Sequence, residues 1–196
     1  NYNLLGSLNF YKTSVKISNS KFFNIHSEDA VNIIDSNFNL ENVIFDDIKY
    51  DAIDFDFTIG KLSNLKFKNI GNDAIDFSGS NVEVNNIFGS DINDKFISVG
   101  EKSEIKVNKS FLVKSNIGIA SKDGSKVLAK NIDFKDVIYP FASYRKKKEY
   151  GGGKLDISKF KIKNYKSKFL KDQYSEIKLD QKKQNYITKN ILNLIY

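Results

Sequence analysis

Two stretches of this chain repeat one acidic pattern 22 residues apart. The first reads YDAIDFDF from position 50, and the second reads NDAIDFSG from position 72. In both, one aspartate precedes a short apolar segment (Asp51, Asp73) and a second stands inside it (Asp54, Asp76). Successive side chains of a strand point to opposite faces, so the flanking apolar residues turn the second aspartate outward. The pattern therefore predicts a column of carboxylates on one outer face.

Such a column allows three kinds of chemistry, because like charges opposite one another are destabilising unless something compensates them. Asp54 and Asp76 could share a Ca²⁺ ion, which takes several carboxylate oxygens. They could instead perform acid–base catalysis on a sugar, since neighbouring carboxyl groups split their pKa values. In a lyase-like form of the first explanation, the acids hold Ca²⁺ and Lys95 or Arg145 is the base. Alternatively, each aspartate caps its turn or pairs with a lysine. The pattern leaves all three open.

The acidic pattern belongs to an internal repeat. Positions at steps of 22 are Ala30, Ala52, Ala74, Phe96, Gly118 and Pro140, and the residue after each is apolar. A second series, at steps of 22 or 23, is Asn19, Asn42, Asn64, Asn86, Asn108 and Asn131. A fixed period of this length indicates a solenoid.

Within one period, three short stretches alternate apolar and polar residues, and Gly, Asn, Asp and Ser separate them. Period-two alternation predicts strands, and the separating residues favour turns. The sequence therefore predicts an all-β, right-handed, single-stranded parallel β-helix with about 22 residues per coil and coils stacked at roughly 4.8 Å. The asparagine series predicts an internal ladder, in which amide groups of successive coils bond to one another.

We expect residues 1–196 to form one β-helix domain cut from a longer chain, because the sequence starts with neither Met nor an apolar signal segment. The step from Val127 to Leu155 is 28 residues, which predicts a projecting basic, glycine-containing loop at 143–153. The apolar stretch 185–196 is expected to cap the last coil, whose edge would otherwise be unpaired.

Charge is distributed unevenly, with 15 of the 31 Lys and Arg residues but only 5 of the 24 Asp and Glu residues in positions 145–196. A basic end attracts acidic polymers, although no nucleic-acid-binding motif is present. No apolar run has the length of about 20 residues that a membrane-spanning helix needs. The expected binding residues are Asp51, Asp73, Asp94, Lys146, Lys147, Lys148 and Tyr150.

The segments YDAIDFDF, GNDAIDFSGSNVEV, DKFISVGEKSEIKV, NIGIASKDGSKV and KKKEYGGG, in this order, resemble a family of bacterial right-handed β-helix repeat proteins. Members of that family often accompany CotH-type domains in exported proteins. The resemblance covers about residues 28–160. It implies the pectate-lyase-like superfold and an extracellular or cell-envelope location, but no particular reaction.

A looser similarity is to polygalacturonases, which carry acidic motifs on two successive coils and a histidine motif on the next. Asp51, Asp73 and the stretch DKFISVG stand near those positions. The chain lacks the paired aspartates, and Lys95 and Phe96 stand where the histidine motif would be. Fold similarity by itself does not transfer function.

Two functions follow from the sequence. The preferred one is a non-catalytic surface module that binds a glycan or a partner domain, or acts as a rigid spacer. The alternative is a polysaccharide lyase or glycoside hydrolase that acts on an acidic glycan through Asp54 and Asp76. A groove in which Asp54, Asp76 and Lys95 converge would favour the enzyme.

Overall fold

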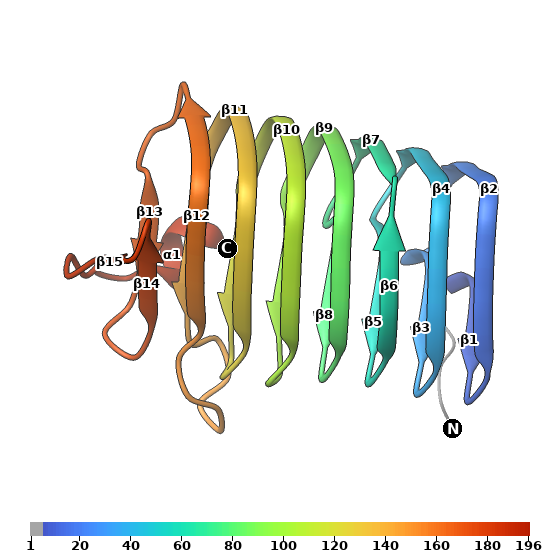
Figure 1. The fold of residues 1–196 in the computed structure, drawn as a ribbon, viewed down its shortest axis with the longest axis horizontal. Helices are drawn as coiled ribbons and strands as arrows, with labels where there is room; N and C mark the ends of the chain where they lie inside the picture. The colour runs from blue at the N-terminus through green and yellow to red at the C-terminus, as the bar shows by residue number, and fades with distance from the viewer. Residues whose placement is uncertain (1–5) are drawn as a thin grey trace.

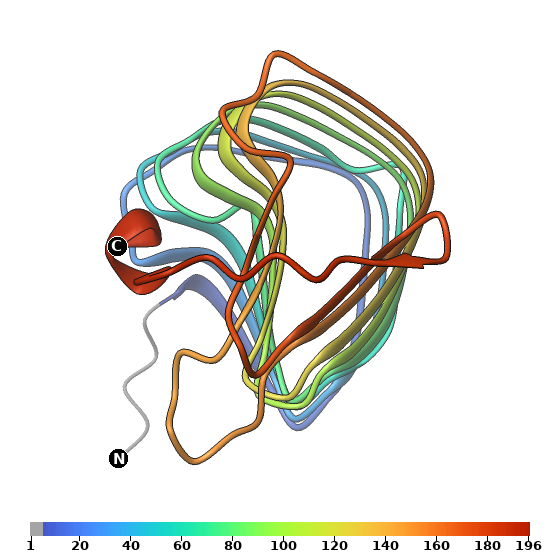
Figure 2. The ribbon, with the colours of Figure 1, turned by 90° about the vertical axis from the view of Figure 1, so that its left-hand side faces the viewer.

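A computed structural model describes residues 6–196, which form an all-β parallel solenoid of about eight turns (Figure 1). The chain advances toward the viewer of Figure 2 while turning counter-clockwise, which makes the solenoid right-handed. The elements are β1 (Gly6–Tyr11), β2 (Ser14–Ile25), β3 (Asp29–Ile34), β4 (Asn37–Ile48), β5 (Asp51–Asp56), β6 (Ile59–Ser63), β7 (Lys66–Ile70), β8 (Ile75–Ser78), β9 (Asn81–Gly100), β10 (Glu104–Lys122), β11 (Lys126–Tyr144), β12 (Lys154–Lys163), β13 (Phe169–Lys171), β14 (Glu176–Leu179), β15 (Lys182–Lys183) and the short helix α1 (Leu192–Ile195).

Each coil passes through three faces in turn. Face A contains β1, β3, β5, β8, the last residues of β9, β10 and β11, and β13. Face B contains β6, β14 and the first residues of β2, β4, β9, β10, β11 and β12. Face C contains β7 and the later residues of β2, β4, β9, β10, β11 and β12. The predicted parallel β-helix is therefore confirmed.

The corners between faces explain where the repeat places its polar residues. The corner between faces B and C uses left-handed backbone at Asn19, Asn42, Asn64, Asn86, Lys109 and Asn131, with φ between 49° and 61°. The corner between faces C and A does the same at Asn24, Asp47, Asn69, Asp91, Lys114 and Asp136. Asn and Asp tolerate this conformation better than other residues with a side chain.

The predicted asparagine ladder exists, but it lies outside the solenoid. Asn86 donates from Nδ2 to Oδ1 of Asn64 at 2.7 Å, and Asn131 donates in the same way to Asn108 at 2.9 Å. The stacking is confirmed, whereas the internal position is wrong, because every ladder residue is exposed except Asn108, which is half-buried. In that coil the left-handed residue is Lys109, one position later. The series marks an outer corner.

We expect Asn86→Ala to destabilise the fold by about 1–2 kcal/mol, because alanine is strained at positive φ. Asn86→Gly should stay within about 0.5 kcal/mol of the parent, since glycine adopts this conformation freely. Urea unfolding of both variants measures the difference. Equal losses for alanine and glycine would instead assign the effect to the hydrogen bond with Asn64.

An internal polar ladder does exist, at the corner between faces A and B, and it consists of hydroxyl groups. Its buried members are Ser36, Thr58, Ser80, Ser103 and Ser125. The backbone N–H of Thr58 donates to Oγ of Ser80 at 2.9 Å, and that of Ser80 donates to Oγ of Ser103 at 2.9 Å. These hydroxyl groups satisfy corner N–H groups that the strand pairing does not reach.

Ser80→Ala should lower the free energy of unfolding by about 1–3 kcal/mol, because the N–H of Thr58 then loses its acceptor while remaining buried. Thermal unfolding monitored by circular dichroism measures the change. The control is Ser18→Ala, because the side chain of Ser18 on face B is exposed. We expect its free energy of unfolding to change by no more than about 0.5 kcal/mol. Equal melting temperatures for the Ser80 variant and the parent would contradict this role.

The core consists of inward columns that repeat from coil to coil. Ile75 and Phe77 are fully buried, as their alternation predicts. The rings of Phe55 and Phe77 stack at 5.2 Å between centroids, and those of Phe45 and Phe67 also stack at 5.2 Å. Stacked rings add to area burial and hold neighbouring coils in register. This register fixes which outward side chains of face A lie beside one another.

Two segments depart from the coil. Val127 pairs with Leu155, so the long step is a real insertion, and residues 145–153 form a loop that starts two residues later than predicted because β11 extends to Tyr144. The last residues cross the C-terminal end of the solenoid and bring α1 against face A (Figure 2).

Within residues 6–196, no helix is long and apolar enough to cross a membrane.

Candidate functional site

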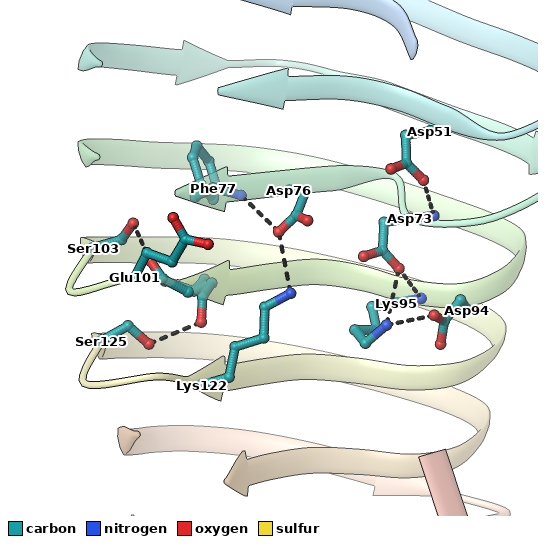
Figure 3. A network of polar contacts seen from close by, with 12 residues as sticks. Asp51, Asp73, Asp76, Phe77, Asp94, Lys95, Glu101, Ser103, Lys122 and Ser125 are labelled. Carbon is teal, nitrogen blue, oxygen red and sulfur yellow. Dashed lines mark hydrogen bonds and ion pairs between the residues drawn. The ribbon is translucent and has the colours of Figure 1, made fainter. Parts of the chain in front are cut away.

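The predicted carboxylate column lies on face A (Figure 3). Asp54 pairs with Asp76 in register, Asn32 precedes them in the neighbouring coil, and Ser98 follows. A second outer column holds Asp29, Asp51, Asp73 and Lys95, and a third holds Ile34, Asp56, Ser78, Gly100 and Lys122. We call Asp29, Asp51, Asp54, Asp56, Asp73 and Asp76 the acidic half of face A.

Two of these aspartates bind the backbone of the next coil. Oδ1 of Asp51 accepts hydrogen bonds from the backbone N of Asp73 at 2.8 Å and from Nδ2 of Asn72 at 2.6 Å. Oδ1 of Asp73 accepts one from the backbone N of Lys95 at 2.9 Å. Each carboxylate therefore caps the following turn, which is the third of the explanations that the sequence left open.

Lys95 closes this column with a buried ion pair. Its Nζ lies 3.4 Å from Oδ1 of Asp73 and also bonds to Asp94, and its side chain is only 3% exposed. Burial lowers the pKa of Lys95, but Asp73 and Asp94 together outweigh burial and raise the pKa above its usual value. A lysine held charged in this way is poorly suited to act as the base of a lyase.

Lys122 forms the corresponding contact for Asp76. Its Nζ lies 3.6 Å from Oδ1 of Asp76, an oxygen that also accepts the backbone N–H of Phe77 at 3.0 Å. The lysine chain crosses Gly100, where an added Cβ would lie 2.9 Å from its Cε. The absent side chain at Gly100 thus leaves the path along which Lys122 reaches a carboxylate two coils away.

Within residues 6–196, Asp54 and its neighbours have no ion-pair partner of this kind. Nδ2 of Asn32 donates to Asp54 at 3.3 Å and to Asp29 at 3.1 Å. Among residues 6–196, no Lys or Arg forms an ion pair with Asp29, Asp51, Asp54 or Asp56. Burial, followed by the charges of Asp56 and Asp76, raises the pKa of Asp54 well above its usual value.

The same causes act on the rest of the acidic half. Burial raises the pKa of Asp51 to about 6, against the hydrogen bond from the backbone of Asp73. Burial and Asp76 raise that of Asp56 to about 6. For Asp73, burial raises the pKa to about 7 although Lys95 opposes it. Perturbed carboxyl groups of this kind often gather at functional sites, though structural networks produce them too.

Beyond the two lysines the face becomes apolar. Ile117, Ala120, Tyr139, Ala142, Tyr144 and Leu170 form a buried cluster with Ile191 and Ile195 from the C-terminal segment. The hydroxyl groups of Tyr144 and Tyr196 lie 3.0 Å apart, and Nζ of Lys95 lies 5.2 Å from the ring centre of Tyr196. The C-terminal segment thus covers one half of face A and ends at the ion pairs.

The predicted basic loop lies outside the acidic half. The guanidinium of Arg145 stacks on Tyr174 at 3.5 Å from the ring centre. The backbone N–H groups of Lys146 and Lys147 donate to Asp123 at 2.7 and 2.8 Å, and Nζ of Lys147 pairs with Glu101. Tyr150 lies 5.8 Å from Nζ of Lys102.

A separate pocket of about 590 Å³ adjoins this loop, and its lining includes Arg145, Lys146, Lys148, Asp172 and Tyr174. The structure therefore does not bring Arg145 together with Asp54 and Asp76. Two lysines of the loop do reach face A: the charge of Lys147 opposes the rise in the pKa of Asp56, and Nζ of Lys146 lies 4.5 Å from the ring centre of Tyr196.

Metal ligation was the first explanation for the column. Among the residues that the structure describes, no group of three or more His, Cys, Asp or Glu side chains is arranged to hold a metal ion. Asp76 shares its Oδ1 with Lys122, so the cation nearest to that carboxylate is a lysine of the chain itself.

The sequence reasoning missed Lys122 and Tyr196 as parts of this face. Extending the 22-residue step from Asp56 through Ser78 and Gly100 leads directly to Lys122, so the signal for that residue was present. The same step from Asp54 and Asp76 places Asn32 and Ser98 in one outward column with them, as the structure does. For Tyr196 no periodic signal exists, because the segment that carries it lies outside the repeat.

Comparison with known proteins adds no family. No protein-family model matches this chain, and no curated protein or solved structure matches it. Of what the resemblance to bacterial β-helix repeat proteins implies, the structure therefore shows the parallel β-solenoid fold and no family.

Proposed function

We propose that this chain is a non-catalytic β-helix module that binds a ligand or a partner domain on the acidic half of face A. The observation that carries the proposal is the difference between two sets of carboxylates. Asp73 and Asp76 have lysine partners within the chain, whereas Asp29, Asp51, Asp54 and Asp56 have none among residues 6–196. Unneutralised, partly buried acceptors on a rigid scaffold suit binding.

The arrangement supports binding better than catalysis. Neither residue proposed as the base of a lyase suits that role beside the acids. Lys95 is charged and buried in its ion pair with Asp73, and Arg145 stacks on Tyr174. Asp54 and Asp76 are direct register neighbours, so they suit a retaining pair, at about 5–5.5 Å, better than an inverting pair, at about 6.5–9.5 Å, but Asp76 is already paired with Lys122. A rigid β-helix with ligand-binding groups on one face needs neither arrangement.

A polysaccharide lyase or glycoside hydrolase remains the second candidate, and one observation favours it. The pKa of Asp73 is raised to about 7 and that of Asp51 to about 6, and a general acid needs a raised pKa to be protonated at neutral pH. Both carboxylates, however, are occupied by backbone N–H groups of the next coil.

The biological setting is proposed on the sequence resemblance alone. It supports a module of a longer exported bacterial protein, located outside the cell or in its envelope. A glycan or a neighbouring domain of the parent protein would then be the partner, and a spacer role is compatible with the rigid solenoid.

The test is a glycan-array and depolymerisation screen of the purified protein. We expect no cleavage, and we expect ligand binding, whether of a glycan or of a partner polypeptide, to be lost in Asp54→Asn combined with Asp56→Asn. The matched control combines Asp133→Asn on face C with Asp156→Asn on face B and should bind normally. Cleavage of an acidic polysaccharide that disappears in Asp54→Asn with Asp76→Asn would replace the module with the enzyme.

A further inference from the structure

We propose that the ligand of the acidic half is a primary ammonium group, such as the lysine side chain of a partner polypeptide, held among Asp29, Asn32, Asp51, Asp54 and Asp56. This inference rests on the proposed binding function and names its ligand class. It follows from how face A treats the same columns in successive coils.

The chain itself supplies two examples of the proposed interaction. In the column of Asp29, Asp51 and Asp73, the fourth coil carries Lys95, whose ammonium group binds Asp73 at 3.4 Å and also Asp94. In the column of Asp56, Lys122 reaches back to Asp76 at 3.6 Å. Each ammonium group is bound at a carboxylate of an earlier coil on the same face.

The coils before these lysines repeat the carboxylates without the ammonium groups. Asp29 is 4% exposed, and none of Asp29, Asp51, Asp54 and Asp56 has an ion-pair partner within residues 6–196. Like charges on adjacent strands repel one another, and burial removes the water that would screen them. A cation placed here would relieve the repulsion as Lys95 does one coil later.

A second observation shows that a hydrogen-bond donor is needed. Asn32 is 6% exposed and lies between Asp29 and Asp54, and its Nδ2 donates a hydrogen bond to each of them. Its Oδ1 is buried and has no hydrogen-bond partner among residues 6–196. A buried acceptor without a donor is destabilising, so this position favours a ligand that donates a hydrogen bond.

These two requirements select an ammonium group over the other ligand classes. An ammonium has three N–H donors and a positive charge, so it can satisfy the Asn32 oxygen and two carboxylates together. A neutral sugar brings donors but no charge. A bare metal ion brings charge, yet the described acids are not arranged in groups of three or more around one point.

The experiment follows backbone amide signals of the isotope-labelled protein by NMR at low salt. The probes are a capped Gly-Lys-Gly-Lys-Gly peptide, its analogue with norleucine in place of lysine, spermidine, calcium chloride and a neutral oligosaccharide. We expect the lysine peptide to shift the signals of β3 and β5 and the norleucine peptide to leave them unchanged. Tighter binding of the peptide than of spermidine assigns the ammonium to a polypeptide partner, and the reverse assigns it to a free polyamine.

The matched variants decide whether the acids are responsible. Asp54→Asn with Asp56→Asn should weaken lysine-peptide binding at least about tenfold, which is about 1.4 kcal/mol. Asp133→Asn with Asp156→Asn should not. The inference is overturned if no ammonium probe shifts β3 and β5, if the norleucine peptide binds equally well, or if the acidic-half variant binds like the control.

The two levels of the account remain separable. If the oligosaccharide or calcium shifts β3 and β5 while no ammonium probe does, the ammonium assignment falls and the binding function stands. If no probe shifts those strands and the glycan array is also negative, both fall. The norleucine peptide guards against shifts caused by the peptide backbone alone.

Discussion

Replacing Lys95 with methionine is expected to lower the free energy of unfolding by about 3–5 kcal/mol at neutral pH. Methionine fills the same volume but leaves Asp73 and Asp94 without the ammonium group that binds both. One oxygen of Asp94 is already buried and unpartnered, so the environment offers no replacement donor. The loss should shrink as the pH falls, because protonation then removes the uncompensated charge of Asp73.

The matched control for this variant is Lys114→Met. Lys114 pairs with Asp91 at 2.8 Å, a shorter contact than that of Lys95 with Asp73, but its side chain is 73% exposed. Exposed ion pairs contribute about 0–1 kcal/mol, so this variant should be nearly neutral. Chemical unfolding of both at two pH values makes the comparison. Equal effects, or a Lys95 loss that does not depend on pH, would contradict the buried ion-pair account.

Stability of the whole protein should increase as the pH falls from about 8 to about 5. Asp51, Asp56 and Asp73 have folded-state pKa values raised to about 6, about 6 and about 7, from 3.8. Between the unfolded and the folded pKa, the native state binds more protons than the unfolded chain, so acidification favours folding. Each such carboxyl contributes about 1–3 kcal/mol over this range, and coupling among them makes the total smaller than the sum.

The lysines do not change the direction of this pH dependence of stability. The pKa values of Lys95 and Lys122 are raised from 10.5, so the stability that they contribute is present throughout this range and is lost only at higher pH. Asp54→Asn with Asp56→Asn should raise the melting temperature at pH 8 and flatten the pH dependence. A melting temperature that is constant, or that falls on acidification, would contradict the raised pKa values.

The fold could be predicted because each coil repeats the same physical constraints. Inward Ile and Phe columns and left-handed corners recur every 22 or 23 residues, and both leave a periodic record in the sequence. The period alone does not say whether a repeated polar residue lies inside or outside the solenoid. Our prediction places Asn86 inside the solenoid, but its side-chain amide forms its hydrogen bond on the outside. The internal ladder instead uses Ser80 and Ser103, whose hydroxyl groups fit a buried corner.

The site could be predicted only as far as the period extends. Asp54 and Asp76 occur side by side as their spacing implies. The partners of these acids depend on side-chain reach: Lys122 crosses two coils because Gly100 leaves space, and periodicity carries no information about reach. Arg145 was grouped with the acids by charge and motif alone, whereas the insertion that carries it turns toward Tyr174.

The central claim is that face A holds carboxyl groups out of water and close to one another, and that those of its N-terminal half have no ion-pair partner within residues 6–196. A carbon-detected NMR titration of the aspartate side chains tests this claim most directly. The account predicts that Asp51 and Asp56 titrate near 6 and Asp73 near 7. Titration of all three near the ordinary aspartate value of about 3.9 would contradict it.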